Sequence, residues 1–391
     1  MNLLFIQQGA RVRETTNGKF YVDTSFNNNI WKRYNQYCDK LTVILRKVAG
    51  KFEEEELRNK YNWIDTDLVN LVLVDDVFLP KKNFFNMKIR RKINLTIKNE
   101  VIKTDKVILR SAGDFYTNIA YKYCKKYHKV FLIESIGFPL KSFWYHSMFG
   151  KFISGIIDYR CKKAIYNAPY VVYVTNKALQ KKYPTNGKNI GCSDIEIKID
   201  KDINKKKIDE SKIIIGTAAS LNTKIKGQKD VLKALNILKK QNLNNFEYQL
   251  VGTGDSSYLK KFIIKYNLVD NVKILGPLAH DKVFGWLDNI DIYIQPSYNE
   301  GLSRSIIEAM SRKCAVICTD VGGNTELIDT EFTYKKGKSK ELAKILKKYN
   351  TKRIEEQGEK NYNKSKKYDE AKLKYKRDKF YLEFESDGGI D

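Results

Sequence analysis

Short apolar runs alternate with amphipathic segments from one end of the chain to the other. Short apolar runs suit buried strands, whereas apolar residues at helical spacing suit helices that cover a sheet. Alternation of the two is typical of α/β layers built around a parallel sheet. In the first half of the chain we expect one sheet, with strands at Leu3–Gln7, Leu41–Leu45, Leu68–Leu73, Lys106–Arg110, Val130–Ile133 and Tyr170–Val174.

A second series of strands and helices follows the basic, aperiodic stretch Lys198–Lys212, which is typical of a connection between domains. We therefore expect two Rossmann-like αβα domains, at residues 1–200 and 201–365, and then a C-terminal helix and tail at 366–391. In the second domain the pattern predicts strands at Ile213–Gly216, Phe246–Val251, Val272–Leu275, Ile290–Ile294 and Ala315–Cys318, and helices at Gln228–Gln241, Ser257–Tyr266 and Leu302–Arg312.

The chain carries a formal net charge of +26, from 72 Lys and Arg against 46 Asp and Glu. Such a charge points to an anionic partner: nucleic acid, an acidic membrane surface or a phosphorylated substrate. The basic residues form no single stripe and no nucleic-acid-binding motif is present, so we expect no nucleic-acid partner. A basic nucleic-acid-binding protein stays open as an alternative.

The cysteines and histidines do not have the spacing of a metal site. The six cysteines include no C-x-x-C pair and the chain has three histidines, so we expect buried, reduced thiols. No stretch approaches the roughly 20 continuous apolar residues that a spanning helix needs, and no charged leader precedes the first strand. We therefore expect a cytoplasmic protein.

The residues that follow each strand of an open parallel sheet are the first place to look for a ligand site, because ligands bind at the carboxyl ends of the strands. After the strand at Ile290–Ile294, a helix is expected from Leu302. The backbone N–H groups of Gly301, Leu302 and Ser303 then have no partner within the helix. Together with the helix dipole they form a site suited to a diphosphate.

Two carboxylates flank this helix start. Glu300 comes just before the helix and Glu308 lies about two turns into it. Both can accept hydrogen bonds from sugar and ribose hydroxyls on either side of a diphosphate. The alternative is that Glu300 only complements the helix dipole and that Glu308 pairs with Arg304, four residues before it.

A cationic loop follows the strand at Ile213–Gly216. It begins with Ser220 and contains Lys224 and Lys226, and Gly227 then leads into a helix. Cations at a helix N-terminus have the wrong sign for the dipole unless an anion lies between them. The loop is therefore a second candidate for phosphate contact, with a solvated lysine-rich turn as the alternative.

Two glycine loops follow other strands of the second domain. Gly252 and Gly254 come after Phe246–Val251, and Gly322 and Gly323 come after Ala315–Cys318. Glycine at such turns often only relieves backbone strain. Because these loops share the carboxyl edge with the two candidate phosphate sites, we count Gly252 and Gly254 among the ligand-facing residues.

These residues carry a family resemblance. The run Pro296–Met310, with Glu300 and Glu308 in E-x7-E spacing, and Lys226-Gly227 before it resemble the retaining glycosyltransferases of family 4, which have the GT-B fold. The segment Tyr173–Pro184 is similar to one in bacterial polysaccharide-assembly members. The resemblance implies that Glu300 contacts the donor hexose, Glu308 the ribose and Lys226 the diphosphate. It also implies that two domains face a central cleft, with the acceptor bound by residues 1–200 and the nucleotide sugar by 201–365, and that the C-terminal helix returns to the N-terminal domain.

The sequence departs from the family pattern at two positions. Ser220 stands where the family often has Arg, which shifts part of the phosphate neutralisation to Lys224. The family's frequent His after the strand at Val130–Ile133 is absent, and Glu134 is the candidate for a sugar contact there. Gly18, in an early turn, corresponds to a family loop that faces the donor phosphates.

The expected activity is transfer of a hexose-type unit from a nucleoside diphosphate sugar to an acceptor hydroxyl, with retention, in bacterial cell-surface polysaccharide synthesis. Lys226 and the amides at 301–303 supply leaving-group stabilisation, so we expect neither a metal nor another cofactor. A GT-B epimerase or phosphorylase is the alternative within the same fold.

Two segments suggest a lipid-linked glycan acceptor and peripheral binding to the inner face of the cytoplasmic membrane. Lys81–Lys92 mixes basic residues with Phe and Met, and Phe143–Ile153 adds Trp144, Phe149 and Phe152. Both compositions suit an anionic interface. The alternative is that the aromatic side chains pack on the protein's own sheet.

Overall fold

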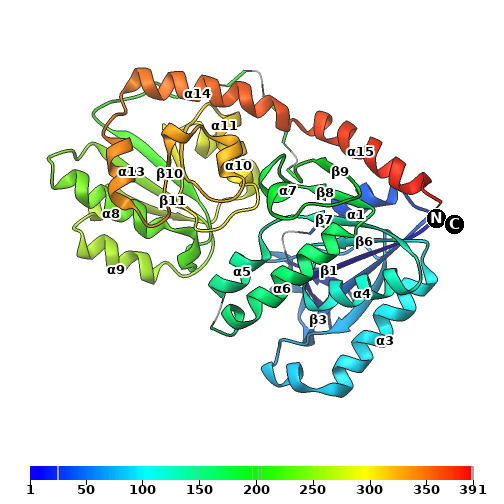
Figure 1. Cartoon of the computed structure of the whole chain (residues 1–391). Helices are drawn as coiled ribbons and strands as arrows, with labels where there is room; N and C mark the ends of the chain where they lie inside the picture. The colour runs from blue at the N-terminus through cyan, green and yellow to red at the C-terminus, as the bar shows by residue number, and fades with distance from the viewer. Residues whose placement is uncertain (24–25, 147, 196, 201, 204, 389–391) are drawn as a thin grey trace. The chain divides into compact units, whose positions relative to one another are not determined.

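The computed structural model describes residues 1–23, 26–146, 148–195, 197–200, 202–203 and 205–388, without the side chains of residues 145, 146, 149, 280 and 281 (Figure 1). The chain divides into two compact units. Unit 1 comprises Met1–Tyr173, Gln180–Gly191 and Lys376–Asp391, and unit 2 comprises Val174–Leu179 and Cys192–Tyr375. Each unit is an α/β structure around its own sheet, as the alternating pattern predicted.

The sheet of unit 1 is parallel across its central path, and every strand expected from the sequence is present. Strands β2 (Phe20–Val22) and β4 (Asn62–Trp63) add an antiparallel extension. The parallel strands, in order across the sheet, are β5 (Asn70–Asp75), β3 (Lys40–Phe52), β1 (Asn2–Thr15), β6 (Lys106–Arg110), β7 (Val130–Ser135), β8 (Tyr170–Tyr173) and β9 (Lys188–Gly191).

Strands β1 and β3 are much longer than the sequence suggested. β1 pairs with β6 only over Leu3–Gln7, the range that was predicted. Beyond that point its residues Arg11–Thr15 pair with Arg46–Phe52 of β3, and β2 joins them through Val12–Glu14. We call this four-stranded extension, with β4 at its edge, the β-ribbon. It continues past the carboxyl edge of the β1–β6 pair.

The helices of unit 1 cover the parallel sheet because its strands are apolar on both faces. Leu3, Leu4, Phe5 and Ile6 of β1, for example, are all fully buried. Helices α3, α4 and α6 lie on the near side of the sheet in Figure 1. The helices up to residue 182 are α1 (Asn28–Asn35), α2 (Glu54–Arg58), α3 (Met87–Lys103), α4 (Phe115–Lys126), α5 (Pro139–His146), α6 (Met148–Tyr166) and α7 (Ala178–Lys182).

The terminal helix α15 (Glu370–Ser386) ends in unit 1, which confirms the expected return of the C-terminal helix. Its residues Tyr381 and Phe384 are buried. The Tyr381 ring packs on Tyr34 of α1, with ring centres 6.2 Å apart. The side chain of Lys106 donates to the backbone carbonyl of Phe384. The last turns of α15 are thus part of the core of unit 1.

The sheet of unit 2 is parallel throughout, and its strand order places β10 and β13 at the centre. The expected strands are all found, with β11 at the predicted residues. In order across the sheet, the strands are β12 (Val272–Gly276), β11 (Phe246–Val251), β10 (Ile213–Ala218), β13 (Ile292–Gln295), β14 (Ala315–Thr319) and β15 (Thr333–Tyr334).

The three helices predicted for unit 2 are present, and four others in the described residues were not foreseen. The predicted ones are α8 (Gln228–Lys239), α9 (Ser257–Lys265) and α11 (Arg304–Ser311). The four others are α10 (His280–Leu287), α12 (Asn324–Leu327), α13 (Ser339–Leu346) and α14 (Thr351–Ser365).

Candidate active site

The loops after the central strands of unit 2 meet at the carboxyl edge of its sheet. Lys226, from the loop after β10, forms an ion pair with Glu300, from the loop after β13, with Nζ and Oε1 2.7 Å apart. These two residues lie 74 positions apart in the chain. The structure therefore brings together the two residues that the sequence marked most strongly, and it sets a cation beside a carboxylate.

A buried glutamine fixes the orientation of this ion pair. The Gln295 side chain is 2% exposed, and its Nε2 donates to Glu300 Oε1 at 3.0 Å. Its Oε1 accepts hydrogen bonds from the Tyr293 hydroxyl at 3.0 Å and from Ser305 Oγ at 3.1 Å. Both Lys226 and Gln295 thus bond the same oxygen of Glu300, Oε1, and together they fix the position of this carboxylate.

Both candidate carboxylates act on one tyrosine. Burial raises the pKa of the Tyr293 hydroxyl, and the charges of Glu308 and Glu300 raise it further. Glu308 lies on α11 and is partly exposed, whereas its neighbours Ile307 and Ala309 are buried. Glu308 therefore lies outside the buried stripe of its helix, and the charges of both carboxylates act on the same tyrosine.

Helix α11 begins two residues later than the sequence suggested. Its first helical residue is Arg304, and Ser303 is its N-cap. The four backbone N–H groups without an intrahelical partner therefore belong to Ser303, Arg304, Ser305 and Ile306. This corrects the predicted set, because Gly301 and Leu302 come before the cap; the Gly301 carbonyl accepts a hydrogen bond from the Gly323 amide at 2.7 Å.

Gly227 lets the loop with Lys226 dock against the loop with Glu300. It has φ of +71°, and an added Cβ would lie 2.0 Å from the backbone oxygen of Pro296. The two loops are also joined by a hydrogen bond from the Tyr298 amide to the Ile225 carbonyl, at 2.8 Å. No side chain larger than hydrogen fits at this position without moving the loops apart.

The other predicted loop residues lie around the end of β11. The Ala219 amide donates to the Val251 carbonyl at 2.9 Å, and a Cβ on Gly252 would lie 2.0 Å from the Ala219 oxygen. Ser220 Oγ donates to Asn222 Oδ1, and a Cβ on Gly254 would lie 2.8 Å from Asn222 Cγ. Ser220, Gly252 and Gly254 are therefore brought together.

Lys224 does not join the ion pair of Lys226. Its ammonium lies 5.4 Å from the centre of the Tyr258 ring on α9. The distance is that of a cation–π contact. In this conformation Lys224 is not directed to the Lys226–Glu300 pair.

Glu134, the sequence candidate in unit 1, is a buried structural carboxylate. It accepts hydrogen bonds from Arg110 Nη1 at 2.6 Å and from the hydroxyls of Tyr34 at 2.6 Å and Tyr381. Burial, the largest single influence, would raise its pKa, but the charges of Arg110 and Arg33 and the hydrogen bonds from the two tyrosines together lower it. These partners explain why a carboxylate lies near the end of β7, so we no longer consider Glu134 a candidate for sugar contact.

Gly18 lies in the turn between β1 and β2. It has φ of +82°, and its amide donates to the Thr15 carbonyl at 3.1 Å. The Thr15 amide in turn donates to the Lys19 carbonyl at 2.8 Å. The turn that the sequence marked as a phosphate loop closes the end of the β-ribbon.

Sequence reasoning missed Gln295, Tyr293 and Asp230. Asp230, buried in α8, accepts hydrogen bonds from the Tyr298 hydroxyl at 2.9 Å and from the Gly337 amide at 3.0 Å. It therefore supports the loop that carries Glu300. Two of these residues could have been found from the sequence. Gln295 is a polar residue at the end of an expected strand, and Asp230 is an acidic residue on the first turn of an expected helix.

Within the described residues, no group of three or more His, Cys, Asp or Glu side chains is arranged to hold a metal ion. Over the same residues, no helix is long and apolar enough to span a bilayer.

Residues 198–369 match the family model "Glycosyl transferases group 1". Protein CapJ of Staphylococcus aureus is 32% identical over 351 residues, which cover 88% of this chain and 85% of that protein. The capsular polysaccharide biosynthesis glycosyltransferase CapH of the same organism is 31% identical over 163 residues, 40% of this chain and 44% of CapH.

Solved structures share the fold at low sequence identity. Sucrose-phosphate synthase from Thermosynechococcus elongatus matches with a TM-score of 0.68 and 13% identity over 98% of both chains. Anabaena HepE in complex with UDP matches with a TM-score of 0.64 and 15% identity, over 97% of this chain and 99% of that one. The chain therefore belongs to the group 1 glycosyl transferases and has the two-unit α/β architecture of GT-B enzymes.

Proposed function

We propose that the protein transfers a hexose-type unit from a nucleoside diphosphate sugar to an acceptor hydroxyl, with retention at the anomeric carbon, as family 4 enzymes do. The Lys226–Glu300 pair beside the start of α11 carries this proposal. The solved complex of HepE with UDP supports a nucleotide at this fold. The name of CapH, a capsular polysaccharide biosynthesis glycosyltransferase, supports a role in bacterial surface polysaccharide synthesis.

In this proposal the diphosphate binds beside Lys226, at the start of α11. The Lys226 ammonium and the first amides of α11 can both donate to phosphate oxygens, and the helix dipole adds to their effect. Glu300, which Lys226 and Gln295 hold in place, accepts hydrogen bonds from hydroxyls of the donor sugar. Glu308 accepts from the ribose hydroxyls.

The chemical step needs little from the protein beyond positioning and charge stabilisation. The bond from the anomeric carbon to the diphosphate oxygen breaks, and the acceptor oxygen bonds to that carbon on the same face. The acceptor proton passes to an oxygen of the leaving diphosphate. Lys226 stabilises the negative charge that develops on the diphosphate. We propose that no metal ion takes part.

A nucleotide-binding measurement tests the donor site directly. A ligand that binds only the folded protein raises the melting temperature. UDP, GDP or ADP at millimolar concentration is expected to stabilise the parent, and Lys226→Ala to lose most of the shift. Lys240→Ala removes the same charge at the far end of α8 and serves as the control. The proposed donor site would be overturned if no nucleotide raised the melting temperature of the parent, or if the shift were as large in Lys226→Ala as in the parent.

We propose further that unit 1 binds the membrane surface to reach a lipid-linked glycan acceptor. In the two segments marked by the sequence, large apolar side chains are exposed: Phe85 at 79%, Met87 at 64%, Trp144 at 47% and Phe152 at 80%. Exposed aromatic and apolar side chains favour the headgroup boundary. Residue 147 and the side chain of Phe149 lie outside the described part of the chain.

A basic pocket of about 640 Å³ lies next to the first segment, between α3, α4 and α6. Its lining combines four cations with apolar side chains and includes no acidic residue among those described. This combination suits the phosphate and the apolar chain of an anionic lipid. The lining residues are Met87, Arg90, Arg91, Asn94, Leu95, Phe115, Asn118, Ile119, Lys122 and Arg160.

A further inference from the structure

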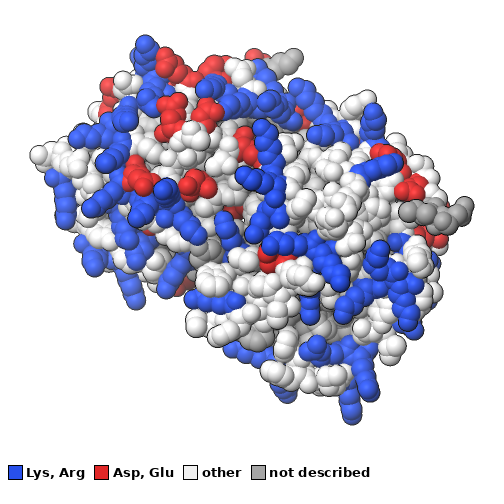
Figure 2. All heavy atoms as spheres, in the orientation of Figure 1, with Lys and Arg blue, Asp and Glu red and all other residues white. Residues whose placement is uncertain are grey.

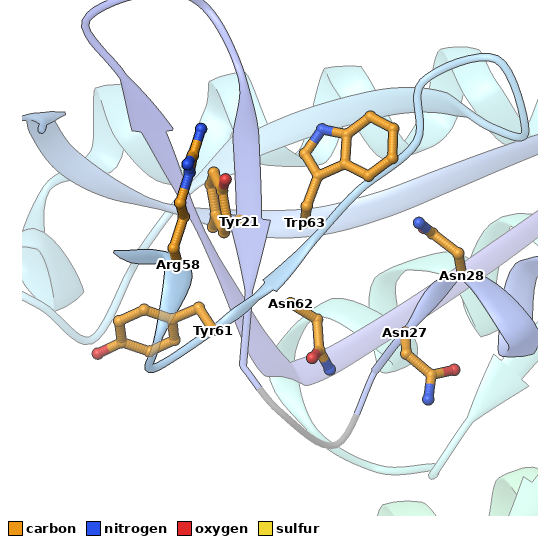
Figure 3. Close-up of a pocket in the computed structure, with 7 residues that line it drawn as sticks. All are labelled: Tyr21, Asn27, Asn28, Arg58, Tyr61, Asn62 and Trp63. Atoms are coloured by element: carbon orange, nitrogen blue, oxygen red, sulfur yellow. The ribbon is translucent and has the colours of Figure 1, made fainter. Parts of the chain in front are cut away.

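The β-ribbon of unit 1 carries a pocket that the donor site does not use. Its volume is about 380 Å³, within the range of roughly 300–1,000 Å³ typical of small-molecule sites. The ribbon continues past the carboxyl edge of the β1–β6 pair, the edge at which open parallel sheets bind ligands. The pocket is lined by Tyr21, Asn27, Asn28, Arg58, Tyr61, Asn62 and Trp63 (Figure 3).

Planar polar groups and aromatic rings make up this lining. Trp63, on β4, is 46% exposed, although large aromatic side chains are usually buried. It lies opposite Tyr21 of β2 in the strand register, and Tyr21 is only 4% exposed. An exposed indole beside a buried phenol offers a flat apolar surface at the rim of a polar pocket. The negative face of such a ring attracts the C–H groups of a ligand.

The amides of the pocket are positioned by the protein. Asn28 Oδ1 accepts from the Asp65 amide at 3.1 Å, and the Asn62 side chain donates to the Phe26 carbonyl. An amide side chain has two donor hydrogens and an acceptor oxygen with two lone pairs. The contact with Asp65 uses one lone pair of the Asn28 oxygen, so this side chain is oriented and its NH2 group can still donate to a ligand.

Glu54 organises the other side of the pocket. Its carboxylate accepts from Asn17 at 2.8 Å, Lys19 at 3.0 Å, Tyr21 at 2.9 Å and Arg58 at 3.2 Å. These hydrogen bonds, that from Asn17 first, lower the pKa of Glu54 to about 2, so the carboxylate stays ionised at neutral pH. Arg58 donates to this carboxylate, which offsets the positive charge of the arginine. In the pocket the Arg58 guanidinium therefore acts mainly as a hydrogen-bond donor.

We propose that this pocket binds a sugar ring of the acceptor glycan, with the ring's C–H face stacked on Trp63 and its hydroxyls bonded by Asn28 and Arg58. Hydroxyls on adjacent ring carbons are both donors and acceptors, which suits amide and guanidinium groups. The inference rests on the proposed transfer to a glycan but concerns a site in unit 1, separate from the donor residues of unit 2. It gives the enzyme a means of holding its acceptor by a saccharide unit.

Saturation-transfer NMR on the full chain tests the proposal without needing a donor. The probes are the methyl α- and β-glycosides of glucose, galactose, mannose and N-acetylglucosamine, each at millimolar concentration. At least one glycoside is expected to receive saturation in its ring protons. Trp63→Ala should reduce that signal at least fivefold, whereas Trp63→Phe, which keeps an aromatic face, should retain most of it.

Tyr166→Ala is the matched control, because Tyr166 is another aromatic of unit 1 with nearly the same exposure, 49%. It should leave the signal unchanged. Melting temperatures of the variants show whether each one is folded. No saturation in any glycoside, or equal signals from the parent and a folded Trp63→Ala, would overturn the proposal. The nucleotide measurement reports on the donor site of unit 2, and the NMR measurement reports on the pocket of unit 1. A failure of the acceptor pocket can therefore be told apart from a failure of the proposed donor site.

Discussion

The proposed function assigns the donor sugar to Glu300 and the ribose to Glu308, and substitutions at the two residues test this assignment. Glu308→Gln keeps the size of the side chain but removes its charge, so nucleoside diphosphate affinity should fall by about 1.5–3 kcal/mol with folding intact. Glu300→Gln weakens the ion pair with Lys226 and should mainly lower kcat. Calorimetric titration and steady-state kinetics measure the two effects. Parent-like binding and turnover in both variants would mean that these carboxylates serve only structural ion pairs.

Gly227 lies where the loop that carries Lys226 packs against the loop that carries Glu300, so replacing it tests how closely these two loops must approach. Alanine there combines backbone strain at φ of +71° with a Cβ 2.0 Å from the Pro296 oxygen. Gly276→Ala is the control, because Gly276 has φ of +76° and no atom within 4 Å of the added Cβ. We expect Gly276→Ala to cost about 1 kcal/mol and Gly227→Ala clearly more, with loss of nucleotide affinity. Equal changes in melting temperature would show that the loops move apart freely.

The sequence marked Lys226 and Glu300 because each is a charged residue in a loop after a strand, and the structure pairs them; their contacts with a donor stay a prediction. It did not predict Gln295, because a polar residue at a strand end has many structural uses. Glu134 shows the converse error. The sequence pattern of a carboxylate near a strand end is the same whether the side chain faces a ligand or a buried arginine. The residues that bond Glu134 could not be foreseen, because Tyr34 and Tyr381 lie 100 and 247 positions away from it.

At the scale of elements, the strands of the two parallel sheets were predicted well because their apolar runs are buried on both faces. The β-ribbon was not, since Gly9–Thr15 contains several polar residues and gains its pairing only from β2 and β3, distant in sequence. The start of α11 was placed two residues early because Leu302 is apolar and buried without being helical.

Helix α11 also underlies a prediction about metal ions. Its N-terminal amides and Lys226 provide positive potential where a divalent ion otherwise neutralises a diphosphate. Transfer activity should therefore survive incubation with excess EDTA. Loss of activity that added Mn²⁺ or Mg²⁺ restores would contradict the phosphate contacts assigned to Lys226 and α11.

For the whole molecule, the net charge of +26 is spread over the surface rather than gathered in one stripe, as the visible face in Figure 2 shows. Charge alone therefore does not locate an anionic partner. The membrane proposal instead rests on the basic pocket of unit 1, which sets four cations beside apolar side chains.

Vesicle co-sedimentation tests the membrane proposal. Each basic residue near an acidic leaflet contributes about 1 kcal/mol, and salt screens this attraction. The protein should pellet with anionic vesicles at low salt, much less at high salt, and little with neutral vesicles. Arg91→Glu with Lys122→Glu should weaken binding more than about tenfold. Lys240→Glu with Lys260→Glu makes the same charge change on unit 2 and should have less effect. Equal pelleting with both kinds of vesicle, or with neither, would contradict the proposal.

The most direct test of the account is release of nucleoside diphosphate from a panel of UDP-, GDP- and ADP-sugars. We expect turnover of at least one donor by the parent and by Lys240→Ala, and strong loss in Lys226→Ala and Glu300→Gln, whose side chains form the ion pair at the sheet edge. Turnover of no donor, or turnover that both of these variants retain, would contradict the assignment of the donor site to the carboxyl edge of unit 2.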